Sequence, residues 1–348
     1  MLKVGIVGLP NAGKTTLFNA LTRAGAEVAT YPFTTIEKNI GIAQIPDKRL
    51  EKIGELLKPK IVTHATTEFV DIAGLVAGAS KGEGLGNKFL AHIREVDAIL
   101  HLVRCFEDAE VSGTVEPLKD IETVKLELAL ADLDFVEKKI GKLQKAAKSG
   151  NEAIKTELES LQRIKDSIQK DESIKHSKGY NLLTTKPCLY LLNLSEKDLT
   201  SKNFTVPDQI RNSLGSEKIV LISAKIEEEL SELERNEREE YRKELGIEDF
   251  TLDVVIEESY NLLNLIKFYT IKGEETRAWS IKEGSKIIDA AYKIHTDMGK
   301  GFIRAEVFSY DDLLSCSSVS RLKDAGLLKI EGRDYLLKDG DIVLIKFH

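Results

Sequence analysis

The stretch Gly8-Leu9-Pro10-Asn11-Ala12-Gly13-Lys14-Thr15 follows the apolar run Val4-Gly5-Ile6-Val7 near the start of the chain. It fits G-x-x-x-x-G-K-[ST], the P-loop pattern in which backbone N–H groups turn inward around phosphate oxygens. The required context is present, because a strand-like run precedes the loop and a helix-forming segment, 15–22, follows it. A helix there would point its positive dipole end at a bound phosphate. The sequence therefore predicts a nucleoside triphosphate site.

Side chains in and near this loop have expected roles. Lys14 should reach the β- and γ-phosphates, and the Thr15 hydroxyl should bind Mg²⁺. A carboxylate at the end of a neighbouring strand should hold the same metal, and Asp71 follows the apolar run 67–70. The D-x-x-G pattern that begins at Asp71 places Gly74 where its backbone N–H can sense the γ-phosphate. Lys14 and Gly74 are therefore the expected catalytic groups.

A further metal ligand is expected from a threonine between the first helix and the second strand. The stretch Tyr31-Pro32-Phe33-Thr34-Thr35 lies there. Thr35 is the preferred candidate and Thr34 is the alternative. A bound nucleoside triphosphate would order Thr35 and the Gly74 loop through the γ-phosphate and Mg²⁺, and hydrolysis would release them.

Composition indicates a globular protein of two or three domains. The 348 residues carry a net charge of −7, so no bulk basic field attracts nucleic acid or membranes. Three widely spaced cysteines predict neither a disulfide framework nor a zinc site, and they suit a reducing cytoplasm. The first strand pattern follows Met1 too closely for a signal peptide. No apolar run approaches the roughly 18 residues of a membrane helix, so no membrane contact is expected.

Short apolar runs alternate with helical or glycine-rich stretches over residues 1–110, which predicts an α/β fold with a mainly parallel sheet. The expected strands are 3–7, 39–44, 67–70, 98–103, 187–192 and 218–222. Ligands of such sheets bind beyond the carboxyl ends of the strands. The P-loop would lie at that edge.

A helical hairpin is expected to be inserted into this sheet. Apolar residues recur in steps of three and four from Leu126 to Ala147, and again from Ile154 to Ile168. The turn Ser149-Gly150-Asn151 separates them, so two amphipathic helices should pack antiparallel. Lysines crowd the turn at positions 138, 139, 142, 145, 148 and 155. These lysines are either a solvated helical face or a basic tip that touches phosphate.

The last part of the chain predicts a small α+β, ubiquitin-like domain. Before it, residues 226–245 and 253–263 are each expected to form a helix. The expected strands of the domain are 267–271, 276–280, 305–309, 335–337 and 342–347, with one helix over 287–295. The expected domains are 1–117 with 179–264 for nucleotide binding, 118–178 for the hairpin, and 265–348 for the C-terminal domain.

The loop after strand 187–192 bears on base specificity. Guanine-specific switches carry N-K-x-D there, whereas this chain has Asn193-Leu194-Ser195-Glu196. Leu194 replaces the lysine of that motif, and the longer Glu196 replaces its aspartate, which would accept from two guanine donors. Adenine offers one amine donor and a ring acceptor on the same edge, so an aspartate set for guanine would face a repelling lone pair. The loop therefore looks released from guanine. The sequence therefore predicts ATP rather than GTP, with Asn193, Leu194 and Glu196 near the base. Ser223 begins S-A-K, a loop that backs the base.

The motifs together resemble those of the YchF/Obg-like ATPase family, a branch of the translation-factor class of P-loop GTPases. The matching stretches are 8–22, 31–37, 71–76, 78–87, 92–98, 103–108, 277–279, 294–297 and 300–307. The resemblance implies a C-terminal TGS domain of β-grasp type, slow Mg²⁺-dependent ATP hydrolysis and association with the large ribosomal subunit or the whole ribosome. A cytoplasmic monomer is expected.

The resemblance also implies a set of ligand contacts. Nucleotide contacts carried over are Asn11, Ala12, Gly13, Lys14, Thr15, Thr16 and Leu194. The implied Mg²⁺ ligands are Thr15 and Thr35. In related potassium-activated members an asparagine like Asn11 helps to hold a monovalent cation, so K⁺ is a second candidate cofactor.

The group that orients the attacking water is left open. Many switch GTPases use a glutamine directly after D-x-x-G, but Leu75 stands there. Many family members carry a histidine in the loop that is 107–113 in this chain, which has none. Glu107, Glu110, the γ-phosphate or a ribosomal group could substitute. His101 is expected to be structural.

Two other functions compete with an ATP-hydrolysing switch. A small-molecule kinase would share the P-loop, but the sequence shows no acceptor pocket or lid arginine cluster. A nucleotide-gated scaffold would bind RNA or protein through the hairpin, and its hydrolysis would be incidental.

Overall fold

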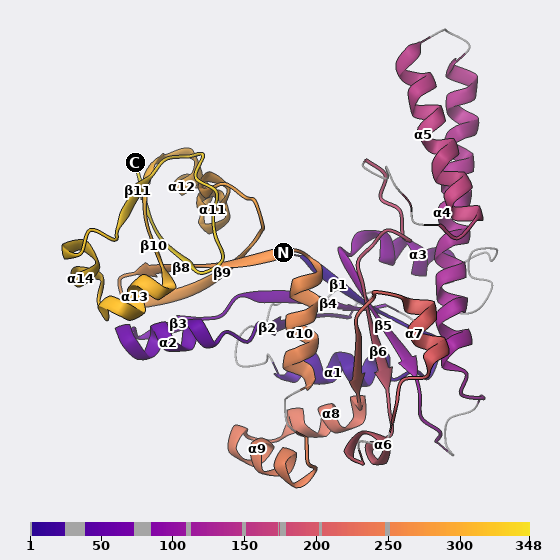
Figure 1. The fold of residues 1–348 in the computed structure, drawn as a ribbon, viewed down its shortest axis with the longest axis horizontal. Coiled ribbons are helices and arrows are strands. Elements are labelled where there is room, and N and C mark those ends of the chain that lie inside the picture. The colour runs from indigo at the N-terminus through magenta and orange to yellow at the C-terminus, as the bar shows by residue number, and fades with distance from the viewer. Residues whose placement is uncertain are drawn as a thin grey trace. The chain divides into compact units, whose positions relative to one another are not determined.

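The computed structural model describes residues 2–24, 39–72, 85–108, 113–147, 151–172, 174, 179–201, 204–247 and 251–348 (Figure 1). The chain forms two compact units. One comprises Leu2–Ile42 and Glu68–Leu252, and the other comprises Ala43–Thr67 and Asp253–His348.

The first unit contains a six-stranded sheet with the order β2-β4-β1-β5-β6-β7. Its strands are β1 (Lys3–Val7), β2 (Asn39–Gln44), β4 (Thr66–Asp71), β5 (Ala98–Arg104), β6 (Cys188–Asn193) and β7 (Ile219–Ile222). From β4 to β7 all neighbours pair in parallel. Every residue of β5 is buried, as expected for a strand covered on both faces. The predicted α/β fold is confirmed, and the carboxyl ends of β1, β4 and β6 meet at one edge.

Helices connect these strands. They are α1 (Lys14–Ala24), α3 (Leu85–Glu95), α4 (Pro117–Ala147), α5 (Glu152–Gln169), α6 (Glu196–Thr200), α7 (Asp208–Leu214), α8 (Ala224–Glu232) and α9 (Arg235–Glu244). The prediction of one helix over 226–245 is wrong, because the backbone is extended at Leu233 and Glu234. The Glu237 carboxylate accepts a hydrogen bond from the Glu234 N–H, which starts a new helix.

The inserted hairpin is formed by α4 and α5 (Figure 1). Five buried side chains make its core: Val136, Ile140, Leu161, Ile164 and Leu182. Ion pairs join the helices, with 2.9 Å between Lys139 Nζ and Glu157 Oε1. Leu126, expected on the apolar face, is instead 58% exposed. It lies two residues from both Val124 and Leu128, which are buried, so it points to the opposite side of the helix.

The second unit contains another six-stranded sheet, ordered β11-β10-β12-β8-β9-β3. Its strands are β3 (Ile61–Thr63), β8 (Leu265–Lys272), β9 (Glu275–Lys282), β10 (Phe302–Ser309), β11 (Lys329–Glu331) and β12 (Asp341–Phe347). Its helices are α2 (Lys48–Leu57), α10 (Thr251–Leu262), α11 (Ile287–Ile294), α12 (Thr296–Lys300), α13 (Tyr310–Cys316) and α14 (Val319–Asp324). Ile287, Ala290 and Ala291 of α11 pack on the sheet, as the predicted α+β arrangement requires.

Several elements of this unit differ from the sequence predictions. The strand expected at 335–337 is only an isolated bridge between Lys286 and Leu336. The pairing of β3 with β9 brings a segment from the first quarter of the chain into the C-terminal sheet. The predicted domain ranges did not anticipate this pairing, and they stay predictions.

Candidate nucleotide site

The loop between β1 and α1 has the backbone of an anion-binding nest. The φ angles of Asn11 and Gly13 are +64° and +92°, so neighbouring N–H groups turn toward a common point. Gly8 is required by close packing, because a Cβ there would lie 2.4 Å from the Leu102 carbonyl oxygen. The Ala12 N–H donates to the Leu9 carbonyl over 3.4 Å. The predicted P-loop therefore has the local geometry that phosphate binding needs.

Lys14 begins α1 and is buried. Its Nζ donates to the Leu9 carbonyl oxygen over 2.9 Å, which holds the ammonium group against the loop. Burial lowers the pKa of Lys14, and the nearby Asp71 charge partly opposes this shift. A partly desolvated cation interacts strongly with an anion that replaces the missing hydration. The site therefore favours an anion beside Lys14.

Thr15, in the first turn of α1, and Asp71, the last residue of β4, bring a hydroxyl and a carboxylate together. The Thr15 Oγ1 donates to the Asp71 Oδ2 over 3.3 Å. Both are hard oxygen ligands of the type that Mg²⁺ prefers, and phosphates and water commonly complete such sites. In the described part of the chain no group of three His, Cys, Asp or Glu side chains could hold a metal by itself. The residues present fit a Mg²⁺ ion that is shared with a nucleotide.

The predicted residues Thr35, Thr34, Gly74, Leu75 and Glu110 lie outside the described residues. Glu107 is described and exposed. Thr16 lies in the first turn of α1 and is half-buried.

Asn193 has a role that its expected contact with the base did not include. Its Nδ2 donates to the Ala12 carbonyl over 2.9 Å, and its Oδ1 accepts from the Ala224 N–H over 2.9 Å. The side chain therefore ties the P-loop to the start of α8. A Cβ on Gly13 would lie 2.6 Å from the same Nδ2, so glycine permits this close approach.

The other base-loop residues differ in exposure. The Leu194 side chain is only 2% exposed, and its N–H donates to the Ile222 carbonyl. Ser223 is also buried. Glu196 is exposed in the first turn of α6, which Ser195 caps by accepting from the Asp198 N–H. Of the side chains named for base contact, that of Glu196 is thus the most accessible.

His101 lies beside the P-loop strand, since β5 pairs it with Val7. Its ring is buried, with its centroid 5.3 Å from that of Tyr190. Burial, with the charges of Lys125 and Lys14, lowers the pKa of His101 to about 3. A neutral, packed imidazole agrees with the structural role expected from the sequence. All three cysteines are free, also as expected.

Among the described residues, no helix is both long and apolar enough to cross a membrane.

A parallel sheet whose first strand runs through a phosphate-binding loop into a helix places the chain in the class of P-loop nucleotide-binding proteins. A family model for 50S ribosome-binding GTPases, MMR_HSR1, matches residues 3–139. The model YchF-GTPase_C, described as a protein of unknown function, matches residues 265–348.

Relatives match over the whole length. The ribosome-binding ATPase YchF of Haemophilus ducreyi is 48% identical over 99% of each chain. That of Bacillus subtilis is 46% identical over 100% of this chain and 99% of its own. The structure of the Schizosaccharomyces pombe YchF GTPase is 35% identical and has a TM-score of 0.88, covering 99% of this chain and 97% of its own. The chain therefore belongs to the YchF family.

Proposed function

We propose that this protein is a ribosome-binding ATPase that acts as a nucleotide-dependent switch. The nest around Lys14, with the adjacent Thr15 and Asp71 oxygens, is the observation that carries the proposal. The names of the H. ducreyi and B. subtilis relatives support ATP and the ribosome as its ligands. We extend the proposal to a cytoplasmic monomer with a TGS-type C-terminal domain.

Groups of this chain would bind the phosphates, hold the P-loop in shape and hold Mg²⁺. The P-loop N–H groups and Lys14 bind the phosphates and stabilise the charge that develops during γ-phosphoryl transfer. Asn193 keeps the loop in that shape through Ala12. Thr15 and Asp71, with Thr35 from the first switch, would hold Mg²⁺. When bound, this ion neutralises charge on the β- and γ-phosphate oxygens.

Further parts of the proposal concern recognition and the second cation. The backbone around Leu194 would contact adenine, and Glu196, which is longer than the aspartate of guanine-specific switches, would not make the paired contact with guanine. Asn11 would help to hold a K⁺ ion. Gly74 would sense the γ-phosphate through its N–H. Because Leu75 has no hydrogen-bonding group, the attacking water would be oriented by Glu107, Glu110, the γ-phosphate or a ribosomal group.

The experiment is an ATP hydrolysis assay on Lys14→Ala, with ATP and GTP binding compared by competition against labelled nucleotide. Loss of one such phosphate contact should slow hydrolysis by about 10²–10³-fold. Lys243→Ala, at an exposed lysine of α9, is the matched control and should retain activity. Full activity of Lys14→Ala would end the proposal, and equal or tighter binding of GTP would refute the assignment to adenine.

Ribosome co-sedimentation of Lys14→Ala separates the switch from the scaffold. A switch predicts that binding by the parent protein differs between ATP and ADP. Release of the parent protein, but not of Lys14→Ala, after incubation with ATP would support the switch, and equal release of both would favour the scaffold.

A further inference from the structure

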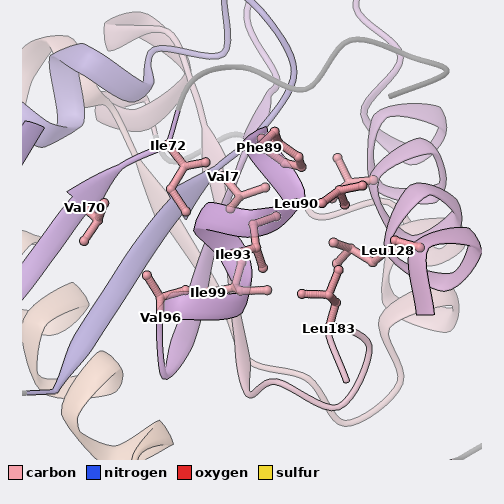
Figure 2. Close-up of a cluster of buried hydrophobic side chains, with 12 residues drawn as sticks. Val7, Val70, Ile72, Phe89, Leu90, Ile93, Val96, Ile99, Leu128 and Leu183 are labelled. Carbon is pink, nitrogen blue, oxygen red and sulfur yellow. The ribbon is translucent and has the colours of Figure 1, made fainter. Parts of the chain in front are cut away.

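Helix α3 lies between the nucleotide-binding sheet and the base of the helical hairpin, and one buried cluster joins all three (Figure 2). From α3 the cluster takes Phe89, Leu90 and Ile93. The sheet side contributes Val7, Val70, Ile72 and Ile99, and α4 contributes Val124, Leu128 and Ala131. Leu183, from the chain that returns from the hairpin, packs beside Leu128 in Figure 2. Close-packed interiors transmit displacement rather than absorb it.

A buried carboxylate fixes α4 to the returning chain. Asp132 of α4 has no exposed surface. Its Oδ1 accepts from the Leu183 N–H over 3.0 Å, and its Oδ2 accepts from the Thr184 N–H over 2.9 Å and the Thr184 hydroxyl over 2.8 Å. The Leu183 N–H is buried outside secondary structure, where it is costly to leave unpaired, so this segment depends on Asp132.

Arg94 attaches the end of α3 to the same carboxylate. Its Nη2 lies 3.8 Å from the Asp132 Oδ1, and its guanidinium carbon lies 5.2 Å from the centre of the Phe135 ring. The Arg94 Nη1 donates to the Asn181 carbonyl over 3.1 Å, and the Asn181 Nδ2 donates back to the Arg94 carbonyl over 2.9 Å. Arg94 therefore contacts both arms that enter the hairpin.

The buried cluster around α3 includes a direct chain neighbour of Asp71, the proposed metal ligand. Ile72, which follows Asp71, packs in the α3 cluster. A change in the position of the β4 end would therefore press directly on the cluster that contains α3. Since Arg94 and Asp132 fasten α3 to the base of α4, the displacement would continue into the hairpin.

We propose that Arg94 and Asp132 form a coupling joint through which the nucleotide state moves the hairpin. The inference rests on the proposed function, because it needs a site that distinguishes ATP from ADP. From Asp132 to the end of α4, 15 residues span about 22 Å at 1.5 Å per residue. A rotation of about 10° at the joint would move the tip by about 4 Å over that length. Arg94 is thus a positioning residue, because it acts through α3 and α4.

The test measures the hairpin directly in the full chain by double electron–electron resonance. Spin labels would be attached at Lys142→Cys near the tip and Glu229→Cys on α8, both exposed positions, in a Cys316→Ser background. Burial raises the pKa of the Cys105 and Cys188 thiols to about 12, which limits their labelling. Distances are recorded with Mg²⁺ and either ADP or a non-hydrolysable ATP analogue.

We expect the distance in the parent protein to shift by several ångströms between the two nucleotides. Arg94→Ala and Asp132→Asn should reduce the shift to less than half, while analogue affinity stays within about threefold. Arg94→Lys keeps the cation and should recover part of the shift, which guards against a variant that fails to fold. Arg163→Ala, at an exposed arginine of α5, is the matched control and should keep the full shift.

An unchanged shift in Arg94→Ala would overturn the inference. A parent protein that binds and hydrolyses ATP without any shift would overturn it too, and would leave the proposed function standing. A parent protein that does not bind the analogue would refute both.

Discussion

Two buried aspartates, Asp132 in the hairpin base and Asp47 in the C-terminal unit, each join segments that are distant in the chain. The two Asp132 oxygens accept from separate backbone N–H groups, of Leu183 and Thr184. Asp47 caps its own helix instead, since its Oδ1 accepts from the N–H groups of Arg49 and Leu50.

The remaining partners of Asp47 are side chains of β8. Its two oxygens accept from the Tyr269 hydroxyl over 3.1 and 3.0 Å, and the Lys267 Nζ lies 3.8 Å away. Lys267 also donates to the Pro46 carbonyl over 2.9 Å. A hydroxyl can rotate and can accept as well as donate, whereas a backbone N–H can only donate. An aspartate-to-asparagine substitution should therefore lower the free energy of unfolding more at Asp132 than at Asp47.

The largest effect is expected for Asp132→Asn. An asparagine has one side-chain acceptor oxygen, so its Nδ2 must face one of the two N–H donors. The free energy of unfolding should fall by about 1–3 kcal/mol, the cost of leaving a donor unsatisfied. Urea unfolding followed by circular dichroism measures it.

Asp134→Asn is the matched control for this change, because Asp134 is exposed and pairs with Lys138. It should cost less than about 0.5 kcal/mol. Equal costs for the two variants would show that the Asp132 contacts contribute little.

A smaller effect is expected for Asp47→Asn. The asparagine Oδ1 can still cap α2, and its Nδ2 can donate to the Tyr269 oxygen. Lys267 keeps its hydrogen bond to the Pro46 carbonyl, so loss of the long ion pair should cost about 1 kcal/mol. Asp47→Ala removes the cap as well and should cost about 1 kcal/mol more. If Asp47→Asn proves as damaging as Asp132→Asn in the same urea assay, the distinction drawn between rotatable and fixed donors is wrong.

The smallest effect is expected for Arg49→Lys in the same unit. Arg49 binds Asp339 through two bonds, of 2.7 and 3.1 Å. Both side chains are partly exposed, so the loss should be about 0.5 kcal/mol at neutral pH. Glu55→Gln, on the exposed face of α2, is a matched control.

Arg49→Lys should also change how the free energy of unfolding depends on pH. Burial acts to raise the pKa of Asp339, but hydrogen bonds from Arg49 and the Lys267 N–H outweigh it and hold the pKa below its usual value. The stability that follows is present above the unfolded pKa of about 4 and is lost as the pH falls through the folded value. In Arg49→Lys the folded pKa should lie closer to the unfolded value, so the acid loss should be smaller and should end at a higher pH. Superimposable acid curves for both proteins would contradict the role of Arg49.

Most of the parallel sheet could be predicted, because its strands are short apolar runs next to recognisable loops. β3 and α2 were missed although Asp47, Leu50, Ile53 and Leu57 have the spacing of a capped amphipathic helix. β3 has only three residues, and two of them, Ile61 and Val62, are exposed. A strand that short carries no usable alternation, so its pairing with β9 depends on tertiary contacts.

The candidate site was predictable where a motif fixes the chemistry. Lys14, Thr15 and Asp71 lie together because each follows or ends a parallel strand. The coupling joint was not predictable in the same way, because Arg94 and Asp132 resemble the solvated charges of any helix. Asp132 gave one signal: it lies four residues after Leu128, on the buried side of α4.

The pairing of β3 with β9 has a consequence for the order of synthesis. Thr63 donates to the Glu275 carboxylate, although the two residues are 212 positions apart. At about 5–20 residues per second, a ribosome needs about 10–40 s to make the intervening chain. During that interval the segment around Asp47 has been made without the strands that receive it. The connection between β2 and β4 can thus reach its final form only after Glu275 has been synthesised.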